Sequence, residues 1–289
     1  MDVLMFSGQG AQKVGMGKGF YDQHAACRQV FEEASDALGL DVAKLCFEDG
    51  EKLNLTQFAQ PALVTVGIAA LRAYELEGEQ AGLLMGLSLG EYTALAAAEV
   101  LGFAETVKLV HKRGLLMAEF AKPGGMVAVM GIDRAVLEDI CKSTHEGFVA
   151  CANFNTPEQI VISGDKAALD YCVGKIKEAK GKAIPLKVAG PFHTPLMDIA
   201  AEKLKEAGSG LDLTPPKLPI ISNVTADVLT YEDLANHMAT HMTSAVQWTN
   251  SVLKAKEMGG TRFIELGIGE TLVNFVKKID PSLETFAKA

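Results

Sequence analysis

The stretch GLLMGLSLGEYTALAAAEV, residues 82–100, decides the fold of this chain. Its first five residues form an apolar run that predicts a buried strand, and a helix-like pattern begins at about Ser88. Gly86 and Gly90 flank this serine two residues away on each side, which matches the pattern G-x-S-x-G. In a strand–turn–helix of this kind, the backbone passes too close to the glycines for larger side chains, and the serine is exposed on a sharp bend. The stretch favours a nucleophilic Ser88, and a serine that only caps the helix is the alternative.

Outward from this stretch, short apolar runs alternate with longer helical patterns. VLMF (3–6) predicts a first buried strand, and residues 57–77 predict a long helix before the strand at 82–86. Another helix is expected near 103–121. Alternating strands and helices are typical of a parallel sheet covered by helices, so we expect an α/β protein.

The pattern changes at residue 124. A strand at 124–132 is followed by a helix at 133–145, with Asp133 as its expected cap. The remaining expected elements are strands at 148–154 and 158–164, joined by a turn at Asn155, Thr156 and Pro157, a helix at 165–181 and a strand at 182–188. The order βαββαβ is that of the ferredoxin-like split unit. We therefore expect a small subdomain over 123–189, inserted into a large domain formed by 1–122 and 190–289. The large domain resumes with helices near 195–207, 231–242, 247–258 and 270–279, and strands at 218–223 and 262–267.

Composition excludes several classes of protein. The chain has 289 residues, is 48% hydrophobic and carries a net charge of −9, which argues against nucleic-acid binding because phosphate contacts need clustered Lys and Arg. Its five cysteines form no C-x-x-C pair and are an odd number, so a reducing compartment is expected. Neither a signal peptide nor an apolar run of membrane-spanning length is seen. We expect a soluble cytoplasmic protein that acts away from membranes and is a monomer.

A nucleophilic serine needs a base, and His193 is the best placed of the six histidines. It lies in the loop GPFHTPLM (190–197), between Pro191 and Pro195. Prolines stiffen a loop, and a stiff loop can hold an imidazole in a defined position. A histidine that ends a strand in the core is the alternative interpretation.

Two other motifs do not support a cofactor or metal site. The glycine loop at 7–17 fails the dinucleotide pattern because Lys13 holds the third glycine position, and it fails the P-loop pattern because Met16 stands where Lys is required. His237 and His241 are four residues apart on a predicted helix, but no Glu follows the first and no third ligand is evident. We therefore expect no metal. The glycine loop could still direct backbone N–H groups toward a site.

Arg113 lies on the apolar side of the helix at 103–121. At about 100° per residue, it falls between Leu109 and Leu116, opposite the charged face. A charge among apolar side chains is costly unless it is paired. Either Arg113 forms an internal salt bridge, or it is free to bind a substrate carboxylate through two parallel hydrogen bonds.

The set of motifs as a whole resembles the malonyl-CoA:acyl carrier protein transacylase family. The resemblance covers nearly the full chain, and its motifs follow one another in the family's order: FSGQGAQ (6–12), GLSLGEYTAL (86–95), HKRGLLM (111–117), ANFNTPEQIVISG (152–164), GPFHTPLM (190–197), SNVTA (222–226) and AVQWTNSV (245–252). It implies a large α/β-hydrolase-like domain with an inserted ferredoxin-like subdomain, which agrees with the layout derived above.

The resemblance also implies roles for individual residues. Ser88 would attack the malonyl thioester and His193 would take its proton. Backbone N–H groups of Gln9 and Leu89 would hold the oxyanion, and Arg113 would bind the malonyl carboxylate. The family uses a Ser–His dyad, so no acidic third member is required.

Five further positions follow from the same resemblance. The backbone carbonyl of Gln247 would orient the imidazole of the base, and Asn155 and Asn223 would line the site. Phe192 is typical of malonyl-selective members, in which a bulky ring crowds an α-methyl branch. Leu87 replaces a histidine that many relatives carry, so we expect altered packing or acyl-chain tolerance at this position and retained chemistry.

The implied reaction is a ping-pong transfer from malonyl-CoA to the phosphopantetheine thiol of acyl carrier protein, without a cofactor. Three alternatives to this function are a free-standing acyltransferase that loads polyketide synthase carrier proteins, a serine esterase or thioesterase, and an inactive scaffold that binds carrier protein. Arg113 on the apolar face argues against the esterase, and the joint presence of Ser88, His193, Arg113 and Gln9 argues against the scaffold. Nothing in the sequence separates fatty-acid from polyketide synthesis.

Overall fold

The computed structural model describes residues 1–289 and contains two four-stranded sheets. The first sheet is parallel, in the order β2-β1-β7-β8. Its strands are β1 (Asp2–Phe6), β2 (Leu83–Gly86), β7 (Arg262–Leu266) and β8 (Glu284–Lys288). The α/β architecture expected from the alternation of strands and helices is confirmed, and β8 is a strand that the sequence analysis did not predict.

Helices cover both faces of the parallel sheet. Leu4 and Phe6 of β1 belong to the largest core cluster, whereas Val3 and Met5 belong to a second cluster with Trp248. Successive side chains on a strand point to opposite faces, and both faces of this sheet are buried, which is why its strands are continuous apolar runs. No helix is both long enough and apolar enough to cross a lipid bilayer.

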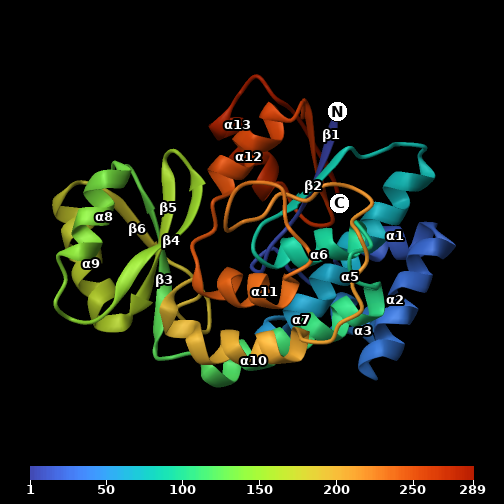
Figure 1. Cartoon of the computed structure of the whole chain (residues 1–289), viewed down its shortest axis with the longest axis horizontal. Helices are drawn as coiled ribbons and strands as arrows, with labels where there is room; N and C mark the ends of the chain where they lie inside the picture. Colours follow the sequence, from blue (N-terminus) through green and yellow to red (C-terminus); the bar gives the residue numbers. More distant parts are fainter.

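The helices of the large domain group by the face they cover. α12 and α13 pack on the second cluster, and Figure 1 shows them together at the top of the molecule. Most of the others surround the first cluster: α1 (Lys18–Gln23), α2 (Ala25–Leu38), α3 (Val42–Phe47), α4 (Gly50–Leu53), α5 (Thr56–Leu76), α6 (Leu89–Ala97), α7 (Phe103–Phe120), α10 (Asp198–Gly208) and α11 (Leu234–Thr243). α12 spans Trp248–Glu257 and α13 spans Thr271–Ile279, and a short 3₁₀ helix occupies Pro195–Met197. No bounds for α1 to α4 were predicted from the sequence.

The second sheet is antiparallel, in the order β4-β5-β3-β6, and forms a separate small subdomain at the left of Figure 1. Its elements are β3 (Gly124–Met130), α8 (Arg134–Lys142), β4 (Val149–Thr156), β5 (Gln159–Asp165), α9 (Lys166–Glu178) and β6 (Lys182–Pro185). The βαββαβ order is confirmed, and Asp133 caps α8 by accepting hydrogen bonds from two backbone N–H groups. The exact limits 123–189 stay a prediction.

Two local expectations were wrong. Asn155 and Thr156 belong to β4, because the turn between the strands is confined to residues 157 and 158. Residues 218–223 form only an isolated parallel bridge between Ile220 and Leu84 and a bridge from Ile221 to Val228. This segment runs beside the edge of β2 for too short a distance to make a ladder, although Ile220 and Ile221 are buried as expected of a strand.

We predict that the fold depends on Gly90 in the bend after β2. A Cβ at this position would lie 2.0 Å from the Phe6 carbonyl oxygen, which belongs to a buried strand and cannot move away. Gly90→Ala should lower the free energy of unfolding by roughly 3 kcal/mol or more. Urea denaturation followed by circular dichroism measures this change.

The matched control is Gly174→Ala in α9, where an added Cβ meets nothing within 4 Å. Because alanine loses less backbone entropy than glycine in a helix, this substitution should stabilise the protein by about 0.5–1 kcal/mol. If the Gly90 variant were as stable as the wild type, the bend would not require glycine.

Candidate active site

Ser88 sits on the bend between β2 and α6, with φ of 52° and ψ of −107°. Residues other than glycine rarely adopt a positive φ, so this backbone is strained by about 1–3 kcal/mol. A Cβ on Gly86 would lie 2.0 Å from the carbonyl carbon of Gly90, so the bend admits only glycine at Gly86 as well. The bend therefore has the geometry of a nucleophile elbow, and Ser88 makes no side-chain cap hydrogen bond to the helix.

Asn223 braces this strained bend from the neighbouring segment. Its side-chain Oδ1 accepts a hydrogen bond from the Ser88 backbone N–H at 2.7 Å, and its Nδ2 donates to the Gly86 carbonyl at 2.7 Å. The asparagine is 1% exposed, so these bonds are not in competition with solvent. Asn223 was expected to line the site, but it does not line the cavity beside Ser88; its side chain bonds the backbone of the bend instead.

His193 lies against the serine, with its Nε2 2.7 Å from Ser88 Oγ. Its own φ is 60°, so both members of the dyad occupy left-handed backbone conformations. The second ring nitrogen, Nδ1, lies 3.1 Å from the backbone carbonyl oxygen of His241. This bond leaves Nδ1 as the donor and Nε2 as the acceptor for the serine proton, which is the tautomer that a general base requires.

The expectation that Gln247 supplies this carbonyl was wrong. The carbonyl oxygen of Gln247 accepts the backbone N–H of Ser251 in the first turn of α12. His241 lies in the last turn of α11, where backbone carbonyls have no intrahelical partner. Its carbonyl oxygen is therefore available to the imidazole of His193.

Burial keeps His193 neutral. The side chain is almost fully enclosed, and the cost of burying an imidazolium lowers the pKa of His193 to about 4. The positive charge of Arg113 lowers this pKa further, whereas hydrogen bonds to backbone groups oppose the change. At neutral pH the imidazole can accept the serine proton.

Two backbone N–H groups are available near the serine. Leu89 is the first residue of α6, so its N–H has no intrahelical acceptor. Gln9 follows β1, and its backbone N–H makes no hydrogen bond within the protein. Gly8 places this loop directly against the bend, since a Cβ there would lie 2.6 Å from the Leu87 carbonyl oxygen. The arrangement is compatible with an oxyanion hole, and the roles of Gln9 and Leu89 remain predictions.

Arg113 is fully buried, with 1% of its surface exposed, and forms no salt bridge. Its Nη1 donates to the side-chain oxygen of Gln60 at 2.8 Å, and its guanidinium carbon lies 5.1 Å from the centre of the Tyr92 ring. Its Nε has no partner. Of the two interpretations of this arginine, the structure therefore excludes the internal salt bridge.

A cavity of about 280 Å³ joins these groups, and it lies between the two subdomains. The large domain contributes Ser88, His193 and Arg113, and the small subdomain contributes Asn155 and residues of β3 and β5. The remaining lining is largely apolar: Gly8, Gln9, Leu87, Met117, Met126, Ala128, Asn153, Gln159, Val161, Leu186, Val188, Phe192, Thr271 and Phe275.

Asn155 and Phe192 both line this cavity, as the sequence analysis expected. Asn155 donates to the Gln159 side chain at 3.1 Å, and its buried Oδ1 has no hydrogen-bond partner. Phe192 is 6% exposed and precedes the base directly. Their roles toward a substrate stay predictions.

Two important groups were missed. Gln60, the partner of Arg113, lies inside an apolar run of α5, where a fully buried amide is a detectable signal. Glu91 is 2% exposed and pairs with His237, whose Nε2 lies 2.5 Å from its Oε1. Glu91 thus accounts for His237 of the histidine pair on α11, and no group of three or more candidate metal ligands occurs in the chain.

Comparison with known proteins agrees with this geometry. Residues 3–281 match the model of the family described as "Acyl transferase domain". The chain belongs to this acyltransferase family. It is 43% identical over 292 residues to the malonyl CoA-acyl carrier protein transacylase of Bacillus subtilis strain 168. This alignment covers 99% of this chain and 92% of that protein.

Solved structures lead to the same family. The acyltransferase superimposes on the malonyl CoA-acyl carrier protein transacylase of Clostridium perfringens with a TM-score of 0.96 and 39% identity, over 99% of this chain and 92% of that one. It also matches a malonyl-transacylase solved in complex with a type II polyketide acyl-carrier protein, with a TM-score of 0.96 and 34% identity, over 99% of this chain and 95% of that one.

We predict that acylation of the enzyme stays independent of pH down to about pH 5. The base must be neutral, and the pKa of His193 is about 4 because burial disfavours its charged form. The kcat/KM for malonyl-CoA should therefore fall only as pH drops toward 4. Stopped-flow or quenched measurement of Ser88 acylation gives the profile, with circular dichroism at each pH as the control for folding. A midpoint near 6.5, the value of an unperturbed histidine, would contradict this assignment.

Proposed function

We propose that this acyltransferase moves a malonyl group from malonyl-CoA to the phosphopantetheine thiol of acyl carrier protein, as an acyl carrier protein S-malonyltransferase. The observation that carries the proposal is a buried guanidinium without a carboxylate partner, in the same cavity as the Ser88–His193 pair. A malonyl group brings a thioester carbonyl and a carboxylate, and the cavity offers a nucleophile and a cation to receive them.

In the first half-reaction, Ser88 Oγ attacks the thioester carbonyl while His193 Nε2 accepts its proton. The oxyanion that forms is stabilised by the backbone N–H groups of Gln9 and Leu89. The His193 imidazolium then gives its proton to the CoA sulfur as the carbon–sulfur bond breaks. The product is a malonyl ester on Ser88 and free CoA.

In the second half-reaction, the carrier-protein thiol attacks the serine ester. His193 accepts the thiol proton and then returns a proton to Ser88 Oγ when the ester bond breaks. One thioester replaces another, so no step requires ATP, a metal or another cofactor. The Arg113–carboxylate pair holds the ester carbonyl in place between the two steps, which favours the bound thiol over water.

The malonyl chemistry is preferred to simple ester hydrolysis because a buried cation in the acyl pocket disfavours uncharged acyl chains. The carrier protein serves either fatty-acid or polyketide synthesis. The match to a transacylase bound to a polyketide acyl-carrier protein supports including polyketide synthesis as a candidate pathway. All five cysteines are free, which supports a reducing compartment such as the cytoplasm.

We predict that Ser88 alone carries the malonyl group. Intact-protein mass spectrometry after mixing with malonyl-CoA should show one malonyl adduct on the wild type and none on Ser88→Ala, because the attacking oxygen is absent. Ser209→Ala, which removes an exposed hydroxyl bonded only to the Lys205 carbonyl, should be acylated like the wild type. An adduct on the Ser88 variant would refute the assignment of the nucleophile.

We also predict that Arg113→Ala separates malonyl from acetyl transfer. Loss of the charged pair should lower kcat/KM for malonyl-CoA about 100-fold, equivalent to about 3 kcal/mol of transition-state binding. Transfer from acetyl-CoA should be unchanged or faster, because the buried charge is gone. Steady-state assays with both donors measure the ratio, and Arg72→Ala, at an exposed pair with Glu75, is the control. Malonyl transfer at the wild-type rate without improved acetyl transfer would disprove the role.

A further inference from the structure

Glu91 and His237 belong to a closed ring of contacts that includes Ser88 and His193. Hydrogen bonds form most of this ring, and one turn of α11 completes it. The backbone N–H of Asn223 donates to Glu91 Oε2 at 2.6 Å, and the other oxygen of this carboxylate lies 2.5 Å from His237 Nε2. The Asn223 side chain is bonded in turn to the Ser88 backbone. The bend that carries the nucleophile is therefore tied to His237 through two intermediate residues.

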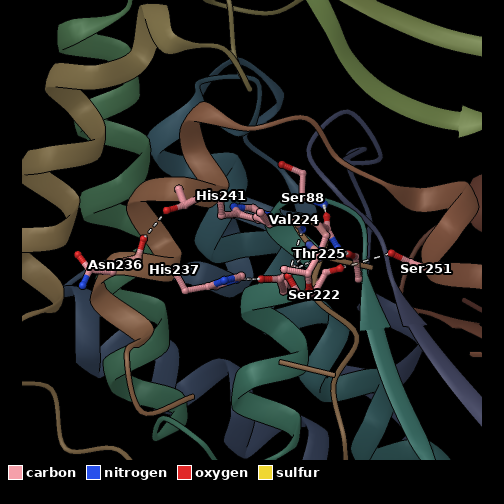
Figure 2. A network of polar contacts seen from close by, with 12 residues as sticks. Ser88, Ser222, Val224, Thr225, Asn236, His237, His241 and Ser251 are labelled. Atoms are coloured by element: carbon pink, nitrogen blue, oxygen red, sulfur yellow. Dashed lines mark hydrogen bonds and ion pairs between the residues drawn. The ribbon is translucent and has the colours of Figure 1, made fainter. Parts of the chain in front are cut away.

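The other half of the ring runs along α11. His237 and His241 are four residues apart on this helix, so their side chains leave the same face, and their rings lie 6.0 Å apart. Figure 2 shows both rings pointing from this helix toward the segment that bears Ser222, Val224 and Thr225. The carbonyl of His241 receives Nδ1 of His193, whose Nε2 meets Ser88 Oγ.

From this closed ring we infer that Glu91 and His237 are positioning residues for the transfer reaction: their pair fixes α11 against α6 and so sets the distance between His193 and Ser88. The inference rests on the proposed roles of Ser88 and His193. Neither positioning residue lines the cavity, so the pair acts on the reaction only through the groups it holds.

The environment of the pair makes it rigid. The Glu91 side chain is 2% exposed and that of His237 is 14% exposed, so water competes little for their hydrogen bonds. Burial alone lowers the pKa of His237, but the carboxylate of Glu91 and its hydrogen bond outweigh this effect and raise the pKa above the usual value. A charge-assisted bond of this kind is stronger than a neutral one and holds its partners closely.

No other polar side chain duplicates this connection. The His241 ring lies between His193 and His237, and neither of its nitrogens has a hydrogen-bond partner, so it contributes to the ring only through its backbone. The ring of His193 also bonds the serine and interacts with the backbone of Ser244 just beyond α11, and neither contact connects α11 to the bend through a side chain of this helix. If the Glu91–His237 pair is broken, α11 keeps its apolar packing but loses its polar connection to the bend.

The test uses the full-length enzyme and three variants in α11. His237→Ala breaks the pair, His237→Gln retains an N–H donor that can reach Glu91, and Asn236→Ala is the neighbouring control, whose side chain bonds only to the exposed Asp233. Each variant is assayed for Ser88 acylation by malonyl-CoA, with kcat and KM separated. Each is also assayed for the rate at which a small uncharged fluorophosphonate labels Ser88, because this reagent needs the dyad and not the malonyl site.

We expect His237→Ala to slow acylation and labelling in parallel, by about 10- to 100-fold, because a displaced base abstracts the serine proton poorly. The KM for malonyl-CoA should change less than about 3-fold, since Arg113 and the cavity are untouched. His237→Gln should recover most of the rate, and Asn236→Ala should behave as the wild type. Wild-type labelling of His237→Ala, or a His237→Gln variant as slow as the alanine variant, would overturn the inference.

Glu91→Leu provides a second route if the His237 variants fold poorly. A leucine has neither an acceptor nor a donor, so it can bond neither Asn223 nor His237, and labelling should slow by a similar factor. Normal labelling of this variant would also overturn the inference. Failure of the proposed function has a different signature: the wild type would be labelled at Ser88 and would not transfer malonyl groups.

Discussion

The 2.7 Å contact between Ser88 Oγ and His193 Nε2 joins side chains that are 105 residues apart in the sequence. Both residues have a positive φ, so the backbone on each side of this contact is strained. Such strain persists only where the surrounding structure determines the conformation, and here Asn223 holds the serine bend while the His241 carbonyl holds the imidazole. The large domain therefore holds both Ser88 and His193 in the positions that this contact requires.

The second constraint is the cost of burying Arg113. An unpaired guanidinium in an apolar core is unfavourable, and the protein compensates only in part through the Gln60 amide oxygen and the face of the Tyr92 ring. Burial lowers the pKa of the neighbouring His193, and the charge of Arg113 lowers it further. A substrate carboxylate would complete the pairing of the guanidinium.

The cavity between the subdomains gives these groups a common space. Met126, Ala128 and Val161 of the small sheet face the large domain, whereas Val127 and Ile162 face α8 and α9. Because strand side chains alternate, one antiparallel sheet closes the cavity on one face and builds its own core on the other. The inserted subdomain thus forms a wall of the site and contributes no group to the dyad.

Features that depend on local pattern could be predicted from the sequence: the strand–bend–helix around Ser88, the βαββαβ order of the insertion, the Asp133 cap and the position of Arg113 on the apolar side of its helix. Each is encoded by spacing within one element, where periodicity and steric limits act directly. The carbonyl that orients His193 could be identified only from the tertiary structure. Gln247 and His241 lie close to each other in the sequence, and the carbonyl at the free end of α11 is the one that meets the imidazole. The tertiary structure also decided the partners of Glu91 and Arg113, since a buried hydrogen bond between distant segments leaves no periodic trace in either of them.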